Sequence, residues 1–146
     1  MTDKLKVLLV EDDRDDRKFF ADALESLDMN IALHQVENGE ECLTFLEDNY
    51  KELNLIFLDL NMPIIDGFEC LDKIKANPQY TDLIVAIYST SSSEQDIDKT
   101  FRKGANIYIN KPSNFPELKK TLKRVIETNW AYKSNDFNKK HFLLKL

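Results

Sequence analysis

The chain has 146 residues, of which 42% are hydrophobic and 32% are charged, a composition typical of a globular domain rather than a disordered or fibrous chain. The formal net charge of −6 disfavours nucleic acid as the main ligand, because phosphate backbones are bound by basic surfaces. No apolar run is long enough for a membrane span, the N-terminus lacks a signal-peptide core, and two cysteines cannot form a disulfide framework. We therefore expect a cytoplasmic protein that binds neither membranes nor nucleic acid.

Short apolar runs alternate with amphipathic stretches along the whole chain, and this pattern predicts strands that alternate with helices. Local signals mark several helix ends. Asn38 is expected to cap a helix, Asn77-Pro78 to end one, and Gly104 to occupy the left-handed position after another. In chain order the predicted elements are strand 6–10, helix 14–27, strand 31–36, helix 40–49, strand 53–58, helix 68–76, strand 83–88, helix 94–103, strand 105–109 and helix 115–130.

Five strand–helix repeats predict an α/β domain with a parallel sheet, and the strands are apolar on both sides because helices cover both faces. A barrel of eight such units needs far more residues than the chain has. The remaining architecture is a doubly wound, five-stranded (βα)5 sandwich.

Polar residues follow four of the predicted strands at the point where each strand ends. The acidic run 11–13 follows the first strand, Asp59 the third, Ser89 the fourth and Lys111 the fifth. In a doubly wound sheet the carboxyl ends of the strands form the ligand-binding edge. These four segments, distant in sequence, are therefore expected to meet in one pocket.

The residue types in this pocket point to phosphoryl transfer. Three carboxylates, those of Glu11, Asp12 and Asp59, repel one another unless a cation lies between them. Oxygen ligands of this kind suit Mg²⁺. Lys111 adds a positive charge for phosphoryl oxygens, Ser89 adds a hydroxyl donor, and a carboxylate can act as the nucleophile.

These motifs, in this order and at these spacings, resemble the receiver domains of two-component response regulators, the CheY-like family. The resemblance covers about residues 4–128. It implies a flavodoxin-like sandwich with strand order 2-1-3-4-5. The matching segments are Val10-Glu11-Asp12, Asp59-Leu60-Asn61-Met62-Pro63 with Asp66-Gly67, Ser89, and Lys111-Pro112.

The resemblance also implies a role for each residue of the metal site. Asp59 matches the aspartate that receives the phosphoryl group. Asp12 and Asp59 match the carboxylates that bind Mg²⁺ or Mn²⁺ directly, and Glu11 matches the acid that acts through a metal-bound water. Asn61 matches the residue whose backbone carbonyl completes the protein's metal ligands.

A second group of residues matches the switch of the family. Lys111 matches the lysine that binds the phosphoryl group, and Ser89 matches the hydroxyl that moves toward it. Tyr108 matches the aromatic residue whose rotamer follows that movement. The family usually has a cis peptide bond before the matching proline, so the resemblance implies a cis bond between Lys111 and Pro112.

Several of these residues also have ordinary structural interpretations. Acidic residues at the start of a helix are favoured by the helix dipole, and we leave Asp15 and Asp16 with that interpretation. Tyr108 lies on a predicted strand and could serve packing alone. Cys42 and Cys70 lack metal-ligand spacing and are expected in the core, and the two histidines, His34 and His141, have no ligand pattern.

The C-terminal segment differs in composition from the rest. Residues 117–146 hold eight Lys or Arg against three Asp or Glu, whereas residues 1–116 hold 12 against 23. We expect a receiver domain over residues 1–128 and an extension over residues 129–146, with no separate output domain. The apolar residues of the extension favour either packing on its own domain or a homodimer interface formed with the last helix, and the sequence does not choose between them.

The predicted function is that of a single-domain response regulator in a phosphorelay. A sensor histidine kinase or a histidine phosphotransfer protein would phosphorylate Asp59 with Mg²⁺ or Mn²⁺, and the output would be phosphorylation-dependent protein–protein binding. The serine run 89–93 and the long last helix resemble the single-domain regulators that partner bacterial phytochromes. We expect self-phosphorylation and self-dephosphorylation rather than an enzyme with external substrates.

Two other functions fit parts of the pattern. One is a binding module that keeps the pocket but works without phosphorylation. The other is a phosphohydrolase with an aspartyl-phosphate intermediate, which usually carries a second acid two residues after its nucleophile. The chain has Asn61 at that position, which disfavours the phosphohydrolase.

Overall fold

Two strands in the middle of the sheet, β3 (Leu55–Leu58) and β4 (Ile84–Ser89), are buried along their whole length because helices cover both of their faces. The structure is a computed structural model that describes residues 4–127 and 143–144. The other strands are β1 (Leu5–Val10), β2 (Ile31–Val36), β5 (Ile107–Asn110) and β6 (Leu143–Leu144). The helices are α1 (Arg14–Glu25), α2 (Gly39–Asn49), α3 (Gly67–Ala76), α4 (Glu94–Arg102) and α5 (Phe115–Glu127), with a short 3₁₀ turn, η1, at Pro78–Tyr80.

The described strands form one parallel sheet in the order β2-β1-β3-β4-β5-β6. The predicted order of the first five strands and the flavodoxin-like architecture are confirmed. Val10 lies beside Leu58, which in turn lies beside Ile87. Because this register brings the carboxyl ends of β1, β3 and β4 to one edge, the residues that follow these strands start from neighbouring positions.

The prediction of five strands was one strand short. Leu143 and Leu144 of β6 pair with Tyr108 and Ile109 of β5, and β6 thereby covers backbone groups at an otherwise open sheet edge. A strand of two residues has no periodicity that a sequence pattern could reveal. The rest of the predicted extension, at 129–142 and 145–146, lies outside the described residues, so the domain division stays a prediction.

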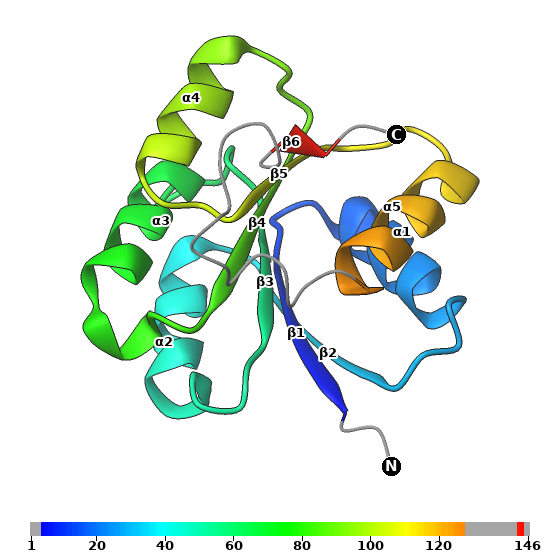
Figure 1. Cartoon of the computed structure of the whole chain (residues 1–146), viewed down its shortest axis with the longest axis horizontal. Coiled ribbons are helices and arrows are strands. Elements are labelled where there is room, and N and C mark those ends of the chain that lie inside the picture. The colour runs from blue at the N-terminus through cyan, green and yellow to red at the C-terminus, as the bar shows by residue number, and fades with distance from the viewer. Residues whose placement is uncertain (1–3, 128–142, 145–146) are drawn as a thin grey trace.

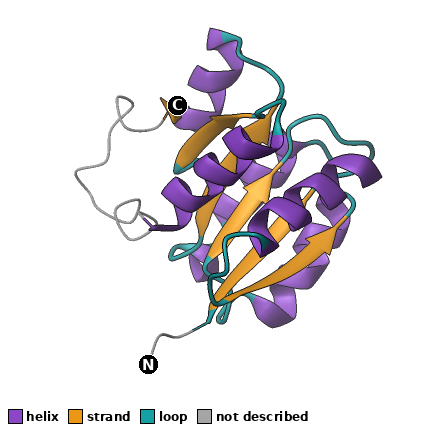
Figure 2. Cartoon of the chain, turned by 90° about the vertical axis from the view of Figure 1, so that its right-hand side faces the viewer, coloured by secondary structure: helices purple, strands orange, loops and turns teal. Residues whose placement is uncertain are grey.

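Two apolar layers hold the sheet between its helices. Helices α1 and α5 cover one face, and α2, α3 and α4 cover the other (Figure 1). Figure 2 shows the sheet lying between the two layers. Phe20 of α1 and Leu122 of α5 are fully buried on the first side, as are Leu46 of α2 and Leu71 of α3 on the second. Within residues 4–127 and 143–144, no helix combines the length and apolar character that a bilayer span needs.

The helices begin where short polar side chains can cap them. Asp13, Asn38, Asp66 and Ser93 each accept a hydrogen bond from the backbone N–H three residues later. The predicted cap at Asn38 is confirmed, and Gly104 has a φ of +97°, the left-handed conformation expected of it. All ten predicted elements are present, with ends that differ by a few residues, and α5 is described as far as Glu127.

The loop between β3 and α3 contains a strained residue. Ile64 has a φ of +70° and its side chain is 73% exposed. A β-branched residue rarely adopts this left-handed conformation, which costs a non-glycine residue about 1–2 kcal/mol. The neighbouring Ile65 is half-buried and packs against the core, so the loop gains packing energy from Ile65 and loses backbone energy at Ile64.

We expect Ile64→Asn to raise the free energy of unfolding by about 1 kcal/mol, because asparagine tolerates the left-handed conformation and little apolar contact is lost. Urea denaturation measures this change. The control is Ile65→Asn, which should destabilise the protein by about 1–3 kcal/mol because it places an amide against the core. A destabilised Ile64→Asn variant would contradict the strain argument.

Candidate functional site

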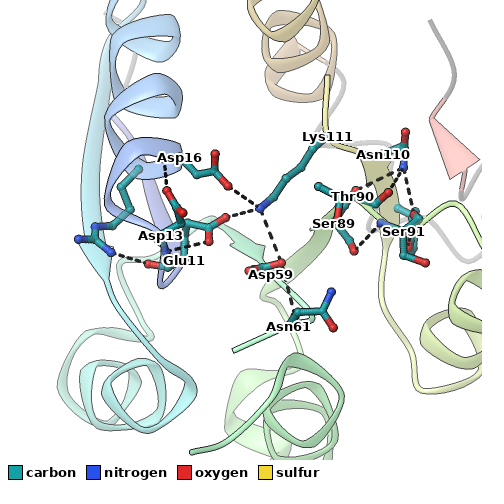
Figure 3. A network of polar contacts seen from close by, with 12 residues as sticks. Glu11, Asp13, Asp16, Asp59, Asn61, Ser89, Thr90, Ser91, Asn110 and Lys111 are labelled. Atoms are coloured by element: carbon teal, nitrogen blue, oxygen red, sulfur yellow. Dashed lines mark hydrogen bonds and ion pairs between the residues drawn. The ribbon is translucent and has the colours of Figure 1, made fainter. Parts of the chain in front are cut away.

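The carboxyl ends of four strands deliver the predicted residues to one pocket. Glu11 follows β1, Asp59 follows β3, Ser89 ends β4, and Lys111 follows β5. Figure 3 shows Asp59 in the middle, with Glu11 on one side and Ser89 on the other. The backbone continues the sheet pairing into this region, since the Asp59 N–H donates to the Val10 carbonyl at 3.1 Å. The side chains that follow the strands are therefore held by the rigid sheet.

Three carboxylates of the pocket lie close enough to share a cation. One oxygen each from Glu11, Asp12 and Asp59 lies within 4.8 Å of the other two. Glu11 and Asp59 are buried, at 1% and 5% exposure, while Asp12 is exposed. An all-oxygen donor set with one open side fits a hard divalent cation that keeps several waters.

The third acidic residue of the run, Asp13, has a different role. Its Oδ1 accepts a hydrogen bond from the Asp16 backbone N–H at 2.9 Å, so it caps α1. Arg17 holds the same loop by donating to the backbone carbonyls of Glu11 and Asp12 at 2.9 and 3.0 Å. These hydrogen bonds hold the loop in place, and the carboxylates of Glu11 and Asp12, rather than that of Asp13, lie beside Asp59.

Lys111 is the cation of the pocket. Its Nζ lies 2.5 Å from Glu11 Oε1, 3.1 Å from Asp16 Oδ2 and 3.8 Å from Asp59 Oδ1. It also lies 5.3 Å from the centre of the Tyr88 ring, within the range of a cation–π contact. One ammonium therefore faces three carboxylates, two of which are buried.

The electrostatics of the pocket follow from burial and crowding. Burial, together with the charge of Asp59, raises the pKa of Glu11 to about 7, although the hydrogen bond from Lys111 opposes the shift. Burial also raises the pKa of Asp59, against the lowering effect of Lys111. Burial alone would lower the pKa of Lys111, but the hydrogen bond to Glu11 and the nearby carboxylate charges raise it instead. The pocket therefore holds more negative charge than Lys111 can balance, and an added cation would relieve it.

The predicted cis bond is not present: the Lys111–Pro112 peptide bond is trans. Trans is the intrinsically favoured form of such a bond, by about 0.5–1 kcal/mol. With this geometry Lys111 still reaches Glu11 and Asp16, and its backbone N–H donates to the Ser89 carbonyl at 2.7 Å. The expectation of a cis bond, which came from the family resemblance, was wrong for this structure.

The predicted switch residues share one hydrogen-bond network. Ser89 is fully buried, and its Oγ accepts from the Ser91 backbone N–H at 3.1 Å. The Ser91 carbonyl accepts from the Tyr108 hydroxyl at 2.8 Å and from the Asn110 amide at 3.1 Å. Tyr108 itself is fully buried. The residues that follow β4 are thus tied to β5.

Gly67, the first residue of α3, lets the helix start close to the backbone that follows β3. Its N–H donates to the Leu60 carbonyl at 2.9 Å. A Cβ at this position would overlap the backbone carbonyl of Asp59 and lie 2.6 Å from the Leu60 Cα. Only glycine fits here without moving the backbone that carries Asp59.

Sequence reasoning missed two residues at the pocket. Asp16 has the sequence context of an ordinary helix-start acid, yet it pairs with Lys111; its position in the first turn of the helix that directly follows the acidic run was the available signal. Tyr88 lies beneath Lys111, and nothing in its sequence context distinguishes it from a core aromatic. The buried thiols of Cys42 and Cys70 lie on α2 and α3, as expected of core residues. His141 lies outside the described residues.

Comparisons with known proteins agree with this geometry. The family model described as response regulator receiver domain matches residues 7–123. The response regulator Rcp1 of Synechocystis sp. is 33% identical over 129 residues, which cover 85% of this chain and 87% of Rcp1. The structure of the Mn²⁺-bound form of Rcp1 matches with a TM-score of 0.73 at 31% identity, covering 86% of this chain and 94% of that chain.

A second solved structure is similar over most of the chain. The phosphorylated cyanobacterial phytochrome response regulator RcpA matches with a TM-score of 0.77 at 32% identity, covering 91% of this chain and 98% of that chain. The metal in the Rcp1 structure agrees with a divalent-cation role for the oxygen cluster of Glu11, Asp12 and Asp59.

We expect the metal-free protein to become less stable as the pH rises from about 4.5 to about 7. The folded pKa of Glu11 is about 7 against 4.5 for a free side chain, so the folded state binds more protons in this window and its stability falls as they dissociate. The loss should be on the order of 3 kcal/mol, measured by urea denaturation with EDTA. Glu11→Gln should flatten this dependence, and the exposed control Glu25→Gln should not.

We also expect Gly67→Ala to lower the free energy of unfolding by about 1–3 kcal/mol, because its methyl group meets backbone atoms that cannot turn away. Thermal unfolding measures the change, with Lys73→Ala on the exposed side of the same helix as the control. Equal stability of Gly67→Ala and the wild type would contradict the close approach.

Proposed function

This chain belongs to the family of response regulator receiver domains, and we propose that it accepts a phosphoryl group on Asp59 from a phosphohistidine of a sensor histidine kinase. The observation that carries the proposal is the position of Asp59, whose carboxylate lies within 4.8 Å of those of Glu11 and Asp12 and 3.8 Å from the ammonium of Lys111. A nucleophile, a cation site and a phosphoryl-binding lysine are the components that phosphoryl transfer requires.

In the proposed reaction, a carboxylate oxygen of Asp59 attacks phosphorus, the phosphorus–nitrogen bond breaks, and its electrons leave with the donor imidazole. Mg²⁺ or Mn²⁺, held by Asp12, Asp59, the backbone carbonyl of Asn61 and, through water, Glu11, would neutralise charge on the transferred group. Lys111 donates hydrogen bonds to the phosphoryl oxygens from the opposite side. The same pocket admits water that attacks the acyl phosphate, so the protein also dephosphorylates itself.

We propose that phosphorylation is read out as a change in protein–protein binding. Ser89 would move toward the phosphoryl group, and Tyr108 would follow, since both are hydrogen-bonded to Ser91. The strand β5 that carries Tyr108 lies between α4 and α5 in space (Figure 1). The surface formed by these three elements is therefore the proposed output surface.

The partners we propose follow from the relatives. Rcp1 and RcpA, the second of them a phytochrome response regulator, are similar to this chain over most of its length, which supports a phytochrome-type histidine kinase or a histidine phosphotransfer protein as the donor. We further propose a cytoplasmic protein in which residues 129–146 either pack on their own domain or form a homodimer interface together with α5. The pairing of β6 with β5 supports a location of the extension at the output surface.

Incubation with acetyl phosphate tests the phosphoacceptor. With Mg²⁺ we expect the intact mass to rise by one phosphoryl group, about 80 Da, and we expect no gain with EDTA. The Asp59→Asn variant should gain nothing under either condition, although it keeps the shape of the side chain. A wild type without a Mg²⁺-dependent adduct would instead favour a binding module that works without phosphorylation.

A further inference from the structure

Lys111 has one partner at the pocket, Asp16, that is not among the residues proposed to bind the metal ion or the phosphoryl group. Asp16 lies on the first turn of α1, and its Oδ2 is 3.1 Å from Lys111 Nζ, compared with 3.8 Å for Asp59 Oδ1. Figure 3 shows Asp16 reaching toward Lys111 from the helix above Glu11, on the side away from Ser89. The resting ammonium is thus drawn toward α1 rather than toward the phosphoacceptor.

We propose that Asp16 is a positioning residue that holds Lys111 away from Asp59 in the resting protein and gives it up when a phosphoryl group arrives. This inference rests on the proposed function, because it concerns the same lysine and the same phosphoryl group. Asp16 therefore slows phosphorylation of Asp59 through its ion pair with Lys111.

The solvent exposure of Glu11 and Asp16 determines which of the two carboxylates can lose its ion pair with Lys111 at the lower cost. The Glu11 side chain is 1% exposed and the Asp16 side chain 46%. A buried carboxylate that loses its partner is left as an uncompensated charge, whereas an exposed one is hydrated by water. Lys111 can therefore leave Asp16 at a much smaller cost than Glu11.

The number of donors on the ammonium limits how many acceptors it can serve at once. A lysine ammonium has three N–H donors, and Glu11 and Asp16 occupy two of them in this structure. A dianionic phosphoryl group offers several acceptor oxygens at the position of Asp59 and competes for the donors. Because Asp16 is the exchangeable partner, its negative charge opposes the movement of Lys111 toward the phosphoryl group.

Charge removal at Asp16 tests the proposal. We expect Asp16→Asn to be phosphorylated by acetyl phosphate with Mg²⁺ about two- to five-fold faster than the wild type, the range that loss of a partly exposed ion pair supports. Affinity for beryllium trifluoride with Mg²⁺, a phosphoryl mimic followed by ¹⁹F NMR, should rise by a similar factor.

Two matched variants distinguish the loss of the Asp16–Lys111 ion pair from other effects of the substitution. Asp15→Asn makes the same charge change on the same helical turn, at an exposed residue that has no ion pair with Lys111 in the described structure, and should behave like the wild type. Asp16→Glu keeps the charge and can still reach Lys111, so it should retain the slow rate. An effect of side-chain shape or helix stability would appear in Asp16→Glu as well.

The outcomes distinguish this inference from the function on which it rests. If the wild-type protein is not phosphorylated and does not bind beryllium trifluoride, the proposed function is overturned, and the role of Asp16 with it. A wild type that does both, with an Asp16→Asn variant no faster than Asp15→Asn, overturns the role of Asp16 alone. A slower Asp16→Asn variant also overturns it, because Asp16 would then assist Lys111.

Discussion

The site depends on a single ammonium group shared among carboxylates from three segments of the chain. Lys111 reaches Glu11 from the β1–α1 loop, Asp16 from α1 and Asp59 from the end of β3. Without this lysine, two buried carboxylates would face each other with no compensating charge, which costs several kcal/mol in a protein interior. With it, the charge is partly compensated but the pocket stays negative, and that residual charge favours binding of a metal ion.

The parallel sheet is what makes this sharing possible. Parallel strands in matched register end at one edge, so residues 100 positions apart, such as Glu11 and Lys111, can form an ion pair. Beneath the pocket, Tyr88 makes edge contacts with Phe20 and Phe57, at centroid distances of 5.5 and 6.4 Å. This aromatic packing connects the floor of the site to the core between the sheet and α1, so Lys111 lies against the packed core of the fold.

The sequence was sufficient for features that arise from periodicity and from the ends of strands. Asp59, Ser89 and Lys111 could be placed together because each follows an apolar run, and the parallel sheet requires such ends to meet. It was insufficient for features that depend on how far a side chain reaches or on the conformation of a single peptide bond. Asp16 belongs to the pocket because its carboxylate extends to Lys111, the Lys111–Pro112 bond is trans, and β6 is too short to produce a pattern. These features depend on tertiary contacts that no local pattern encodes.

The hydrogen bonds around Ser91 connect the pocket to the sheet edge in a way that limits how the site can change. Its backbone N–H donates to Ser89 Oγ, and its carbonyl accepts from Tyr108 and Asn110 of β5. Tyr108 is fully buried, so its hydroxyl cannot lose its acceptor without finding another. A displacement of Ser89 must therefore move Ser91 and rearrange the contacts of Tyr108. Since β6 pairs with β5 at Tyr108, that rearrangement reaches the backbone of the strand that lines the proposed output surface.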